Sequence, residues 1–356
     1  MIQPVTMPKW GLSMERGRIT GWFVQEGDEV KAGDDLADID TDKINGTLES
    51  PGDGVLRRVV AAAGEEVPVG GTIALIAESA TPDNELDEAA RRAREEIDSG
   101  TTEQPEGPVT GFVEVDGRKL AYATMGTEGD DIVLVHGYGG DKNSWLFVQE
   151  PLAKTHVVHA LDLPGHGEST KDVGDGSLDT LADAVLGFLD ARGIAKAHLV
   201  GHSLGGAVVT KAAAKAPEKI EKLTLIAPAG FGTPINAAYL RGFARATTRR
   251  ELKPHLTALF ADPALVTRQL ADDLLKYKRH DGVGKVLTIL LDTLLDGDEQ
   301  AIDAAHLLST VDVPSKTVWG RQDAVLPPGP ADVHVDDAGH LVHLEAPGAV
   351  ITAITG

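Results

Sequence analysis

The sequence predicts two domains of different class: an all-β domain of two pseudo-symmetric antiparallel sheets, and an α/β domain with a mostly parallel sheet and a helical cap. Three observations lead to this prediction. An internal repeat occupies the first 78 residues, a charged segment bounded by prolines follows, and apolar strand-like runs then alternate with helical segments. We place the domain boundaries at 1–78, 79–108 and 109–356, with the cap at about 229–310.

The composition excludes several classes of protein. The chain has 33 Lys and Arg against 55 Asp and Glu, a net charge of −22 that repels nucleic-acid phosphates and anionic membranes. It contains no cysteine, so disulfides, a thiolate nucleophile and cysteine-ligated metals are excluded. Neither a secretion signal nor a run of about 20 apolar residues is present. We expect a cytoplasmic protein without a bound metal, and with neither nucleic acid nor a membrane as a partner.

The repeat consists of EGDEVKAGDDLADI (26–39) and AGEEVPVGGTIALI (63–76). Gly27 and Gly64 lie 37 residues apart, and each begins a unit of turn, short strand, turn and second strand. Two such copies predict two antiparallel sheets packed face to face. Between the copies lies DIDTDKINGTLES (38–50), a predicted hairpin with Lys43 at its exposed tip.

These residues resemble the lipoyl domain of 2-oxoacid dehydrogenase complexes. The resemblance covers 5–77 and rests on MPKWGLSM, GDEVKAGD, DIDTDKI, SPGDGV and VPVGGTIALI as a set. It implies that lipoic acid is joined by an amide to Lys43, and an amine on a protruding turn suits an arm that visits other active sites. An ordinary solvated turn lysine is the alternative. Biotinyl domains share the fold, but their lysine usually lies between methionines, whereas Asp42 and Ile44 flank Lys43.

The segment 79–108 predicts a linker with one short helix. Opposite charges in NELDEAARRAREEID (84–98) recur at i, i+4 spacing, which favours a helix. We expect a solvated spacer helix, although a thin apolar stripe could dock on a partner or on the second domain. The stripe comprises Leu86, Ala90, Ala93 and Ile97.

The rest of the chain predicts the α/β domain. FVEVDGRKLAYATMG is typical of a hairpin that turns at Asp116-Gly117. Apolar strands alternating with helical stretches predict a mostly parallel sheet, whose strand carboxyl ends form the site. The expected strands are 132–135, 157–161, 198–200, 223–226 and 317–319.

The segment AHLVGHSLGGA (197–207) contains a candidate nucleophile, Ser203. The pattern predicts a strand, a tight turn and a helix, with the serine exposed at the apex between Gly201 and Gly205. The helix that follows would direct N–H groups and its positive dipole end toward the same point. Polar motifs at later strand ends supply Asp323 and His340.

The chain order Ser203, Asp323, His340 resembles the α/β-hydrolase fold, from residue 111 to the end of the chain. The resemblance implies that His340 takes the serine proton and that Asp323 orients the imidazole. It also implies that the N–H groups of Tyr138 and Leu204 form the oxyanion hole. Asp323 and His340 are only 17 residues apart, so we expect a shortened segment before the last strand.

Other histidines compete for these roles. His343 is close in sequence to His340 and is the rival base. His136 and His166 belong to HGYGG and PGHGES, motifs in which histidine is usually structural.

Residues 229–310 show no strand pattern. Periodic apolar residues in 264–277 and 285–295 predict helices that cover the site. Basic side chains in this cap could contact a nucleotide phosphate, although a solvated helix face is the more ordinary explanation. They are Arg241, Arg245, Arg249, Arg250 and Lys253.

A lipoyl domain and an α/β hydrolase on one chain resemble the acyltransferase component of acetoin dehydrogenase complexes. This resemblance implies lipoate as cofactor, coenzyme A as substrate, and transfer of an acetyl group from a dihydrolipoyl thioester to coenzyme A. The implied partners are a thiamine diphosphate-dependent acetoin dehydrogenase component and dihydrolipoamide dehydrogenase. Two alternatives stay open: an ester or carbon–carbon bond hydrolase that carries a lipoyl domain, and a lipoyl carrier with a non-catalytic hydrolase-like scaffold.

Overall fold

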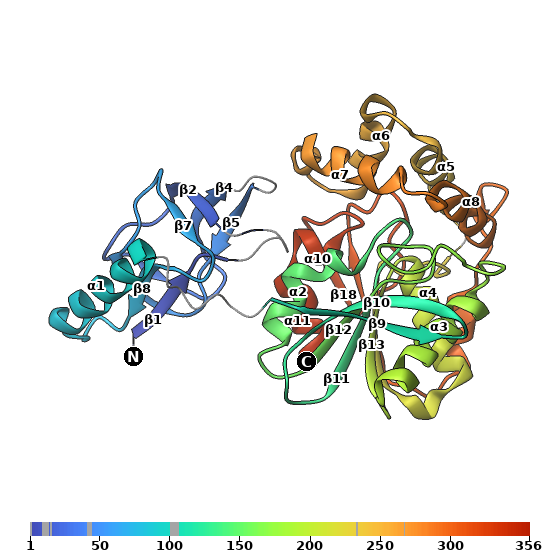
Figure 1. The fold of residues 1–356 in the computed structure, drawn as a ribbon, viewed down its shortest axis with the longest axis horizontal. Coiled ribbons are helices and arrows are strands. Elements are labelled where there is room, and N and C mark those ends of the chain that lie inside the picture. The colour runs from blue at the N-terminus through green and yellow to red at the C-terminus, as the bar shows by residue number, and fades with distance from the viewer. Residues whose placement is uncertain are drawn as a thin grey trace. The chain divides into compact units, whose positions relative to one another are not determined.

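A computed structural model describes residues 2–8, 14, 16–40, 45–99, 107–232, 234–266 and 268–356 of the chain. They form two compact units, 1–107 and 108–356, which Figure 1 colours blue to cyan and green to red. Each unit has its own sheets and its own buried core.

The first unit contains two antiparallel sheets of four strands each, as the repeat predicts. The strands are β1 (Ile2–Thr6), β2 (Arg16–Trp22), β3 (Glu29–Val30), β4 (Asp35–Asp40), β5 (Asn45–Glu49), β6 (Gly54–Val59), β7 (Glu66–Pro68) and β8 (Thr72–Ala77). The strand orders are β1-β8-β6-β3 and β5-β4-β2-β7. Buried apolar side chains from both sheets, such as Ile19 and Ile73, form the core.

The internal repeat is visible as an exchange between the two sheets. β3 and β4 lie in different sheets, and their counterparts β7 and β8 lie in the opposite ones. Gly27 and Gly64 both have positive φ, 101° and 91°, a conformation that glycine adopts without strain. β4 and β5 pair as the predicted hairpin, with Asp40 opposite Asn45. Residues 41–44, which include the tip lysine Lys43, lie outside the described residues.

The predicted linker helix is α1 (Asp83–Ser99), and it is not a solvated spacer. Leu86, Ala93 and Ile97 of its apolar stripe are buried, and the helix packs on β6 and β8. Charged contacts between α1 and the rest of the first unit add to this packing: Arg57 and Arg58 with Asp83, Arg58 with Asp87, and Arg94 with Glu65. The expectation of a solvated spacer helix is therefore wrong, because the apolar stripe of α1 packs on the sheet of the first unit.

The second unit is built on an eight-stranded sheet in the order β18-β17-β14-β13-β11-β12-β10-β9. Its strands are β9 (Val109–Val115), β10 (Arg118–Met125), β11 (Asp131–Val135), β12 (Val157–Leu161), β13 (Ala197–His202), β14 (Ile220–Ile226), β17 (Ser315–Gly320) and β18 (Val333–Val335). All five predicted strands lie within these elements. The parallel strands are β11, β12, β13, β14, β17 and β18, whereas β9 and β10 form the predicted hairpin at Asp116-Gly117.

Helices cover both faces of this sheet. Val133 and Val135 of β11 belong to the core that also contains α3 (Leu178–Arg192) and α4 (Leu204–Lys215). Ile132 and Leu134 belong to the core on the other face, with α2 (Leu146–Leu152) and α11 (Pro347–Thr355). This alternation follows from the two-residue period of a strand.

Between β14 and β17 the chain forms the helical cap, seen above the sheet in Figure 1. Its helices are α5 (Ala237–Arg245), α6 (Arg249–Leu256), α7 (Arg268–Lys278), α8 (Val283–Leu294) and α9 (Ala304–Ser309). The cap also contains a small hairpin, β15 (Leu295–Asp296) and β16 (Glu299–Gln300), which the sequence analysis missed because two-residue strands show no alternation. Residues 321–332 between β17 and β18 contain no helix, in agreement with the short spacing there.

Candidate active site

Ser203 occupies a strained turn between β13 and α4. Its φ is 53° and its ψ is −118°, a region that residues with a side chain avoid. The turn is tight because a Cβ on Gly201 would collide with Gly205 O, and a Cβ on Gly205 would collide with Val135 O. The N–H of Ser203 donates to Ile226 O of β14 at 3.0 Å. The serine is thereby fixed at the carboxyl edge of the sheet.

The structure brings Asp323 and His340 into direct contact. His340 Nδ1 lies 2.8 Å from Asp323 Oδ2, and both residues are buried. The same oxygen accepts a hydrogen bond from Trp319 Nε1 at 3.1 Å. Oδ1 accepts from the N–H groups of Val325 and Leu326 at 2.8 and 2.9 Å. These donors hold the carboxylate toward Nδ1, so the imidazole proton sits on Nδ1 and Nε2 is left free to act as a base.

Ser203 lies beside this pair without being bonded to it. His202, the preceding residue, has its ring 4.7 Å from the ring of His340 and donates from Nε2 to the His340 carbonyl at 3.0 Å. Among the hydrogen bonds of the described residues, none joins Ser203 Oγ to His340. Such bonds often tighten only when a substrate binds.

The two predicted oxyanion-hole residues flank Ser203. Leu204 is the first residue of α4, where helix N–H groups have no partner within the helix. Tyr138 follows Gly137, whose backbone is so close that a Cβ there would lie 3.0 Å from Ser203 Cβ. The Tyr138 hydroxyl reaches the cap and donates to Leu287 O at 2.9 Å.

His343 is placed differently from its rival His340. Its ring packs 4.7 Å from Trp145 and 4.6 Å from His202. Burial lowers the pKa of His343 to about 3, so the ring is neutral near pH 7. Within the described residues, neither ring nitrogen has a hydrogen-bond partner, and the same is true of Trp145 Nε1. The contact with Asp323 therefore favours His340 as the base.

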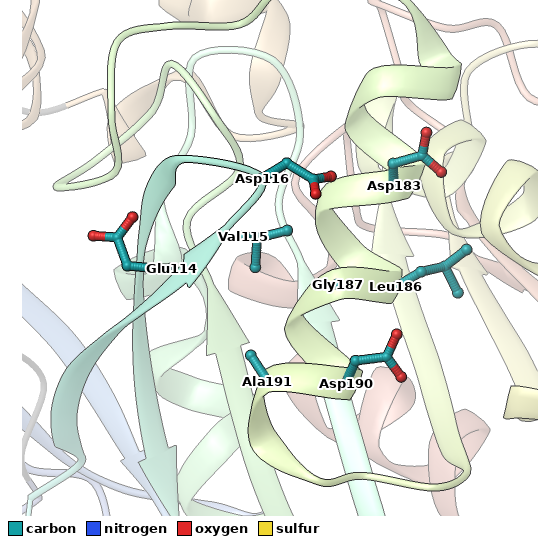
Figure 2. A pocket seen from close by; sticks show the side chains of 8 residues that line it. All are labelled: Glu114, Val115, Asp116, Asp183, Leu186, Gly187, Asp190 and Ala191. Atoms are coloured by element: carbon teal, nitrogen blue, oxygen red, sulfur yellow. The ribbon is translucent and has the colours of Figure 1, made fainter.

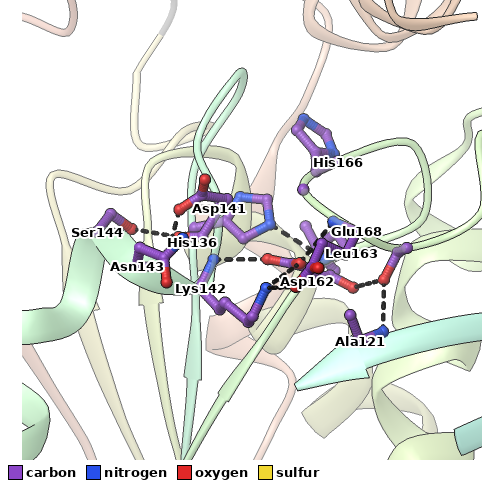
Figure 3. A network of polar contacts seen from close by, with 12 residues as sticks. Ala121, His136, Asp141, Lys142, Asn143, Ser144, Asp162, Leu163, His166 and Glu168 are labelled. Carbon is purple, nitrogen blue, oxygen red and sulfur yellow. Dashed lines mark hydrogen bonds and ion pairs between the residues drawn. The ribbon is translucent and has the colours of Figure 1, made fainter. Parts of the chain in front are cut away.

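A second buried network joins the loop after β11 to the loop after β12 (Figure 3). At its centre is Asp162, whose Oδ1 accepts from Lys142 N at 2.6 Å. Its Oδ2 accepts from Lys142 Nζ at 3.1 Å and from Glu168 N at 2.9 Å. His136 and His166 lie in the same network. Neither Lys142 nor Asp162 was predicted from the sequence; the position of an acid directly after a buried strand is a signal for Asp162 alone.

The basic residues of the cap do not form one free patch. Arg241 pairs with Asp298, and Arg249 holds Asp272 with two hydrogen bonds of 2.6 and 2.7 Å from Nη2. No carboxylate of the described residues forms an ion pair with the three exposed members, Arg245, Arg250 and Lys253.

An acidic hollow on the second unit lies apart from these residues. Figure 2 shows it between the end of β9 and helix α3. Glu114, Asp116, Asp183 and Asp190 carry its charge, and Lys215 pairs with Asp183. Since no predicted catalytic residue lines this hollow, we do not assign the chemistry to it.

The described part of the chain has no helix that is long and apolar enough to span a membrane. Those same residues bring together no group of three or more His, Cys, Asp or Glu side chains that could hold a metal ion.

Comparison with known proteins assigns a class to each unit. Residues 3–76 match the family model described as biotin-requiring enzyme, and residues 131–347 match the one described as alpha/beta hydrolase fold. A 2-hydroxy-6-oxo-6-phenylhexa-2,4-dienoate hydrolase from Rhodococcus sp. has a similar structure, with a TM-score of 0.60 and 21% identity, over 68% of this chain and 95% of that one. That likeness shows the fold alone. The chain joins a biotin/lipoyl-type domain to an α/β hydrolase.

Two relatives match almost the whole chain. The dihydrolipoyllysine-residue acetyltransferase component of the acetoin cleaving system from Pseudomonas putida is 48% identical over 354 residues, which cover 97% of this chain and 95% of that protein. The component of the same name from Cupriavidus necator is 40% identical over 352 residues, or 97% and 94% of the two chains. The chain belongs to this acetyltransferase family, which confirms the resemblance seen in the sequence.

Proposed function

We propose that Ser203, His340 and Asp323 transfer an acetyl group from a dihydrolipoyl thioester to coenzyme A. The observation that carries this proposal is the buried Asp323–His340 hydrogen bond of 2.8 Å beside the strained Ser203 turn. A serine hydroxyl is a weak nucleophile at neutral pH and needs a base that is itself oriented. His340 is oriented in this way.

The reaction has two halves that use the same groups. Ser203 Oγ attacks the thioester carbonyl while His340 Nε2 takes its proton, and the N–H groups of Tyr138 and Leu204 stabilise the oxyanion. The C–S bond breaks, the proton passes to the leaving sulfur, and the acetyl group remains on Ser203. The thiol of coenzyme A then gives its proton to His340 and attacks the ester. The C–O bond breaks, and the proton returns to Ser203 Oγ.

We further propose that lipoate is attached to Lys43. The first unit matches the biotin/lipoyl-type model, and β4 and β5, which precede and follow Lys43 in the chain, pair antiparallel with Asp40 opposite Asn45, which supports a swinging-arm site. The group would supply the thiol that carries the acetyl group. The proposed partners are a thiamine diphosphate-dependent acetoin dehydrogenase component and dihydrolipoamide dehydrogenase, in a cytoplasmic complex.

For coenzyme A, we propose that its phosphates contact the exposed basic residues of the cap. Arg245, Arg250 and Lys253 support this role because they are exposed and have no ion pair with the described residues. Arg241 and Arg249 support it less, since Asp298 and Asp272 already neutralise them.

The test is to measure both products from one reaction. Purified full-length protein is mixed with free acetyl-dihydrolipoamide and coenzyme A, and acetyl-coenzyme A and acetate are quantified. We expect acetyl-coenzyme A to dominate at saturating coenzyme A. Acetate as the main product would favour the hydrolase alternative. If the folded, lipoylated protein forms neither product, the non-catalytic scaffold becomes the better account.

A further inference from the structure

We propose that His136 and His166 are positioning residues, which together hold the Tyr138 N–H in the orientation that the oxyanion requires. The inference rests on the proposed function in one respect, the use of Tyr138 N–H as an oxyanion donor. Its own support comes from two hydrogen bonds that cross between the loops after β11 and β12.

Each ring binds the backbone of the opposite loop. His136, after β11, accepts at Nε2 from the N–H of Leu163, after β12, at 3.1 Å. His166, after β12, accepts at Nε2 from the N–H of Gly139, after β11, at 3.2 Å. The two ring centroids are 4.8 Å apart, and Figure 3 labels both histidines. We call these four residues the histidine clasp.

The partners define the protonation of both rings. A backbone N–H can only donate, so both Nε2 atoms accept and the single proton of each ring sits on Nδ1. The Nδ1 of His136 donates to Gly137 O at 2.8 Å, and that of His166 donates to Pro164 O at 3.2 Å. Burial lowers the pKa of both rings, which maintains the neutral form that can accept a hydrogen bond.

The clasp encloses the oxyanion residue. His136 is anchored on one side of Tyr138, and Gly139 on the other. Asp162 fixes the same loop further along by accepting from Lys142 N at 2.6 Å. An oxyanion donor contributes most when it is already directed at the position where charge develops. A loop fixed on both sides of Tyr138 therefore stabilises the transition state more than the bound substrate.

The test compares two substitutions of His166 in the full-length protein. His166→Leu leaves the Gly139 N–H without an acceptor. In His166→Gln, the side-chain oxygen Oε1 can accept this hydrogen bond in place of the histidine Nε2. We expect His166→Leu to lower kcat about 10- to 100-fold, with the KM for acetyl-dihydrolipoamide changed less than about threefold. Affinity for methylboronic acid, which bonds to Ser203 as a tetrahedral mimic, should fall by a similar factor. His166→Gln should recover most of both losses.

His198→Leu is the matched control. His198 is also buried, near the start of β13, and its Nε2 contacts Thr224 Oγ1 at 2.9 Å. This variant should lose stability but keep kcat and boronate affinity.

The proposed positioning role of the clasp is wrong if His166→Leu changes only stability or KM. If that variant does not fold, ¹⁵N NMR of the protein without substitutions tests the proposal through the histidine tautomers. Nδ1–H tautomers at both His136 and His166 support the clasp, and an Nε2–H tautomer at either histidine excludes it. Failure of the proposed function is distinguishable, because it would appear as full activity in Ser203→Ala.

Discussion

The two units of this acetyltransferase present their functional groups in opposite physical settings. Among the described residues of the first unit, Ser50 is the only buried polar side chain, and the candidate carrier lysine, Lys43, comes between β4 and β5 in the chain. In the second unit the candidate groups are buried and come from separate loops at one sheet edge. A carrier group must be able to move to other active sites, whereas catalytic side chains must be held in place by fixed neighbours. A local motif therefore suffices to predict the first function, and the second depends on the whole fold.

The largest expected effects distinguish catalysis by Ser203 from attachment of the lipoyl group to Lys43. Ser203→Ala should lower transfer from free acetyl-dihydrolipoamide by about 10⁴-fold or more, because the nucleophile is lost, while intact mass still shows one lipoyl adduct. Lys43→Arg should abolish the adduct and leave transfer from the free donor within about twofold. An adduct that persists in Lys43→Arg would remove that residue as the attachment site, and activity that survives in Ser203→Ala would remove the nucleophile.

The acid of the site gives the next largest effect. Asp323→Asn should lower kcat by about 10³-fold, because an amide does not hold the His340 proton on Nδ1 as a carboxylate does. The control is Asp332→Asn, since Asp332 accepts hydrogen bonds from Thr317 N and Oγ1 at 2.7 and 2.9 Å and does not contact His340. We expect kcat of Asp332→Asn to change less than about threefold. If Asp323→Asn lowers kcat only slightly, a group other than Asp323 orients the base.

Mild acid should destabilise the second unit more than the first, since the first histidine of the chain is His136. Burial lowers the pKa of six second-unit histidines, to about 3 for His198 and His343; the others are His136, His159, His166 and His202. Unfolding restores a pKa of about 6.5, so below that pH the unfolded chain binds protons that the folded chain does not.

The free energy of unfolding of the second unit should therefore fall from about pH 6.5 toward pH 3, by at most about 1.4 kcal/mol per pH unit for each such histidine. Calorimetry of the full-length protein at pH 7.5 and 5.5 should show its transition moving to lower temperature by more than the first-unit transition. Equal shifts of the two transitions would contradict the burial of these rings in the neutral form.

The same contrast explains how much the sequence predicts. The 37-residue repeat and the Ser203 turn with its two glycines are local patterns, so both were predicted. The pairing of Asp323 with His340 follows from chain order once the fold is known. The Lys142–Asp162 contact could not be predicted, because it depends on which distant loops meet. The stripe on α1 likewise predicts a buried face without saying which surface covers it.

The docking of α1 gives a smaller effect, confined to the first unit. Leu86→Ala should lower the free energy of unfolding of that unit by about 2–4 kcal/mol, since the side chain is fully buried. The control is Arg91→Ala, which breaks only the exposed pair with Glu95 and should cost less than about 0.5 kcal/mol. Thermal unfolding of the full-length protein reports both. Equal effects would mean that the helix is a spacer after all.

The smallest expected effect concerns the acceptor, because exposed charges contribute little and are screened by salt. Replacing Arg245 and Arg250 together with Ala should raise the KM for coenzyme A about three- to tenfold and leave kcat nearly unchanged, with the difference shrinking at high ionic strength. Pantetheine offers the same thiol without the nucleotide phosphates, so its KM should not move. A KM that rises equally for both acceptors would show that the substitutions disturb the cap and not a phosphate site. If neither KM changes, the phosphates of coenzyme A bind elsewhere, and the exposed cations of the cap are only a solvated helix face.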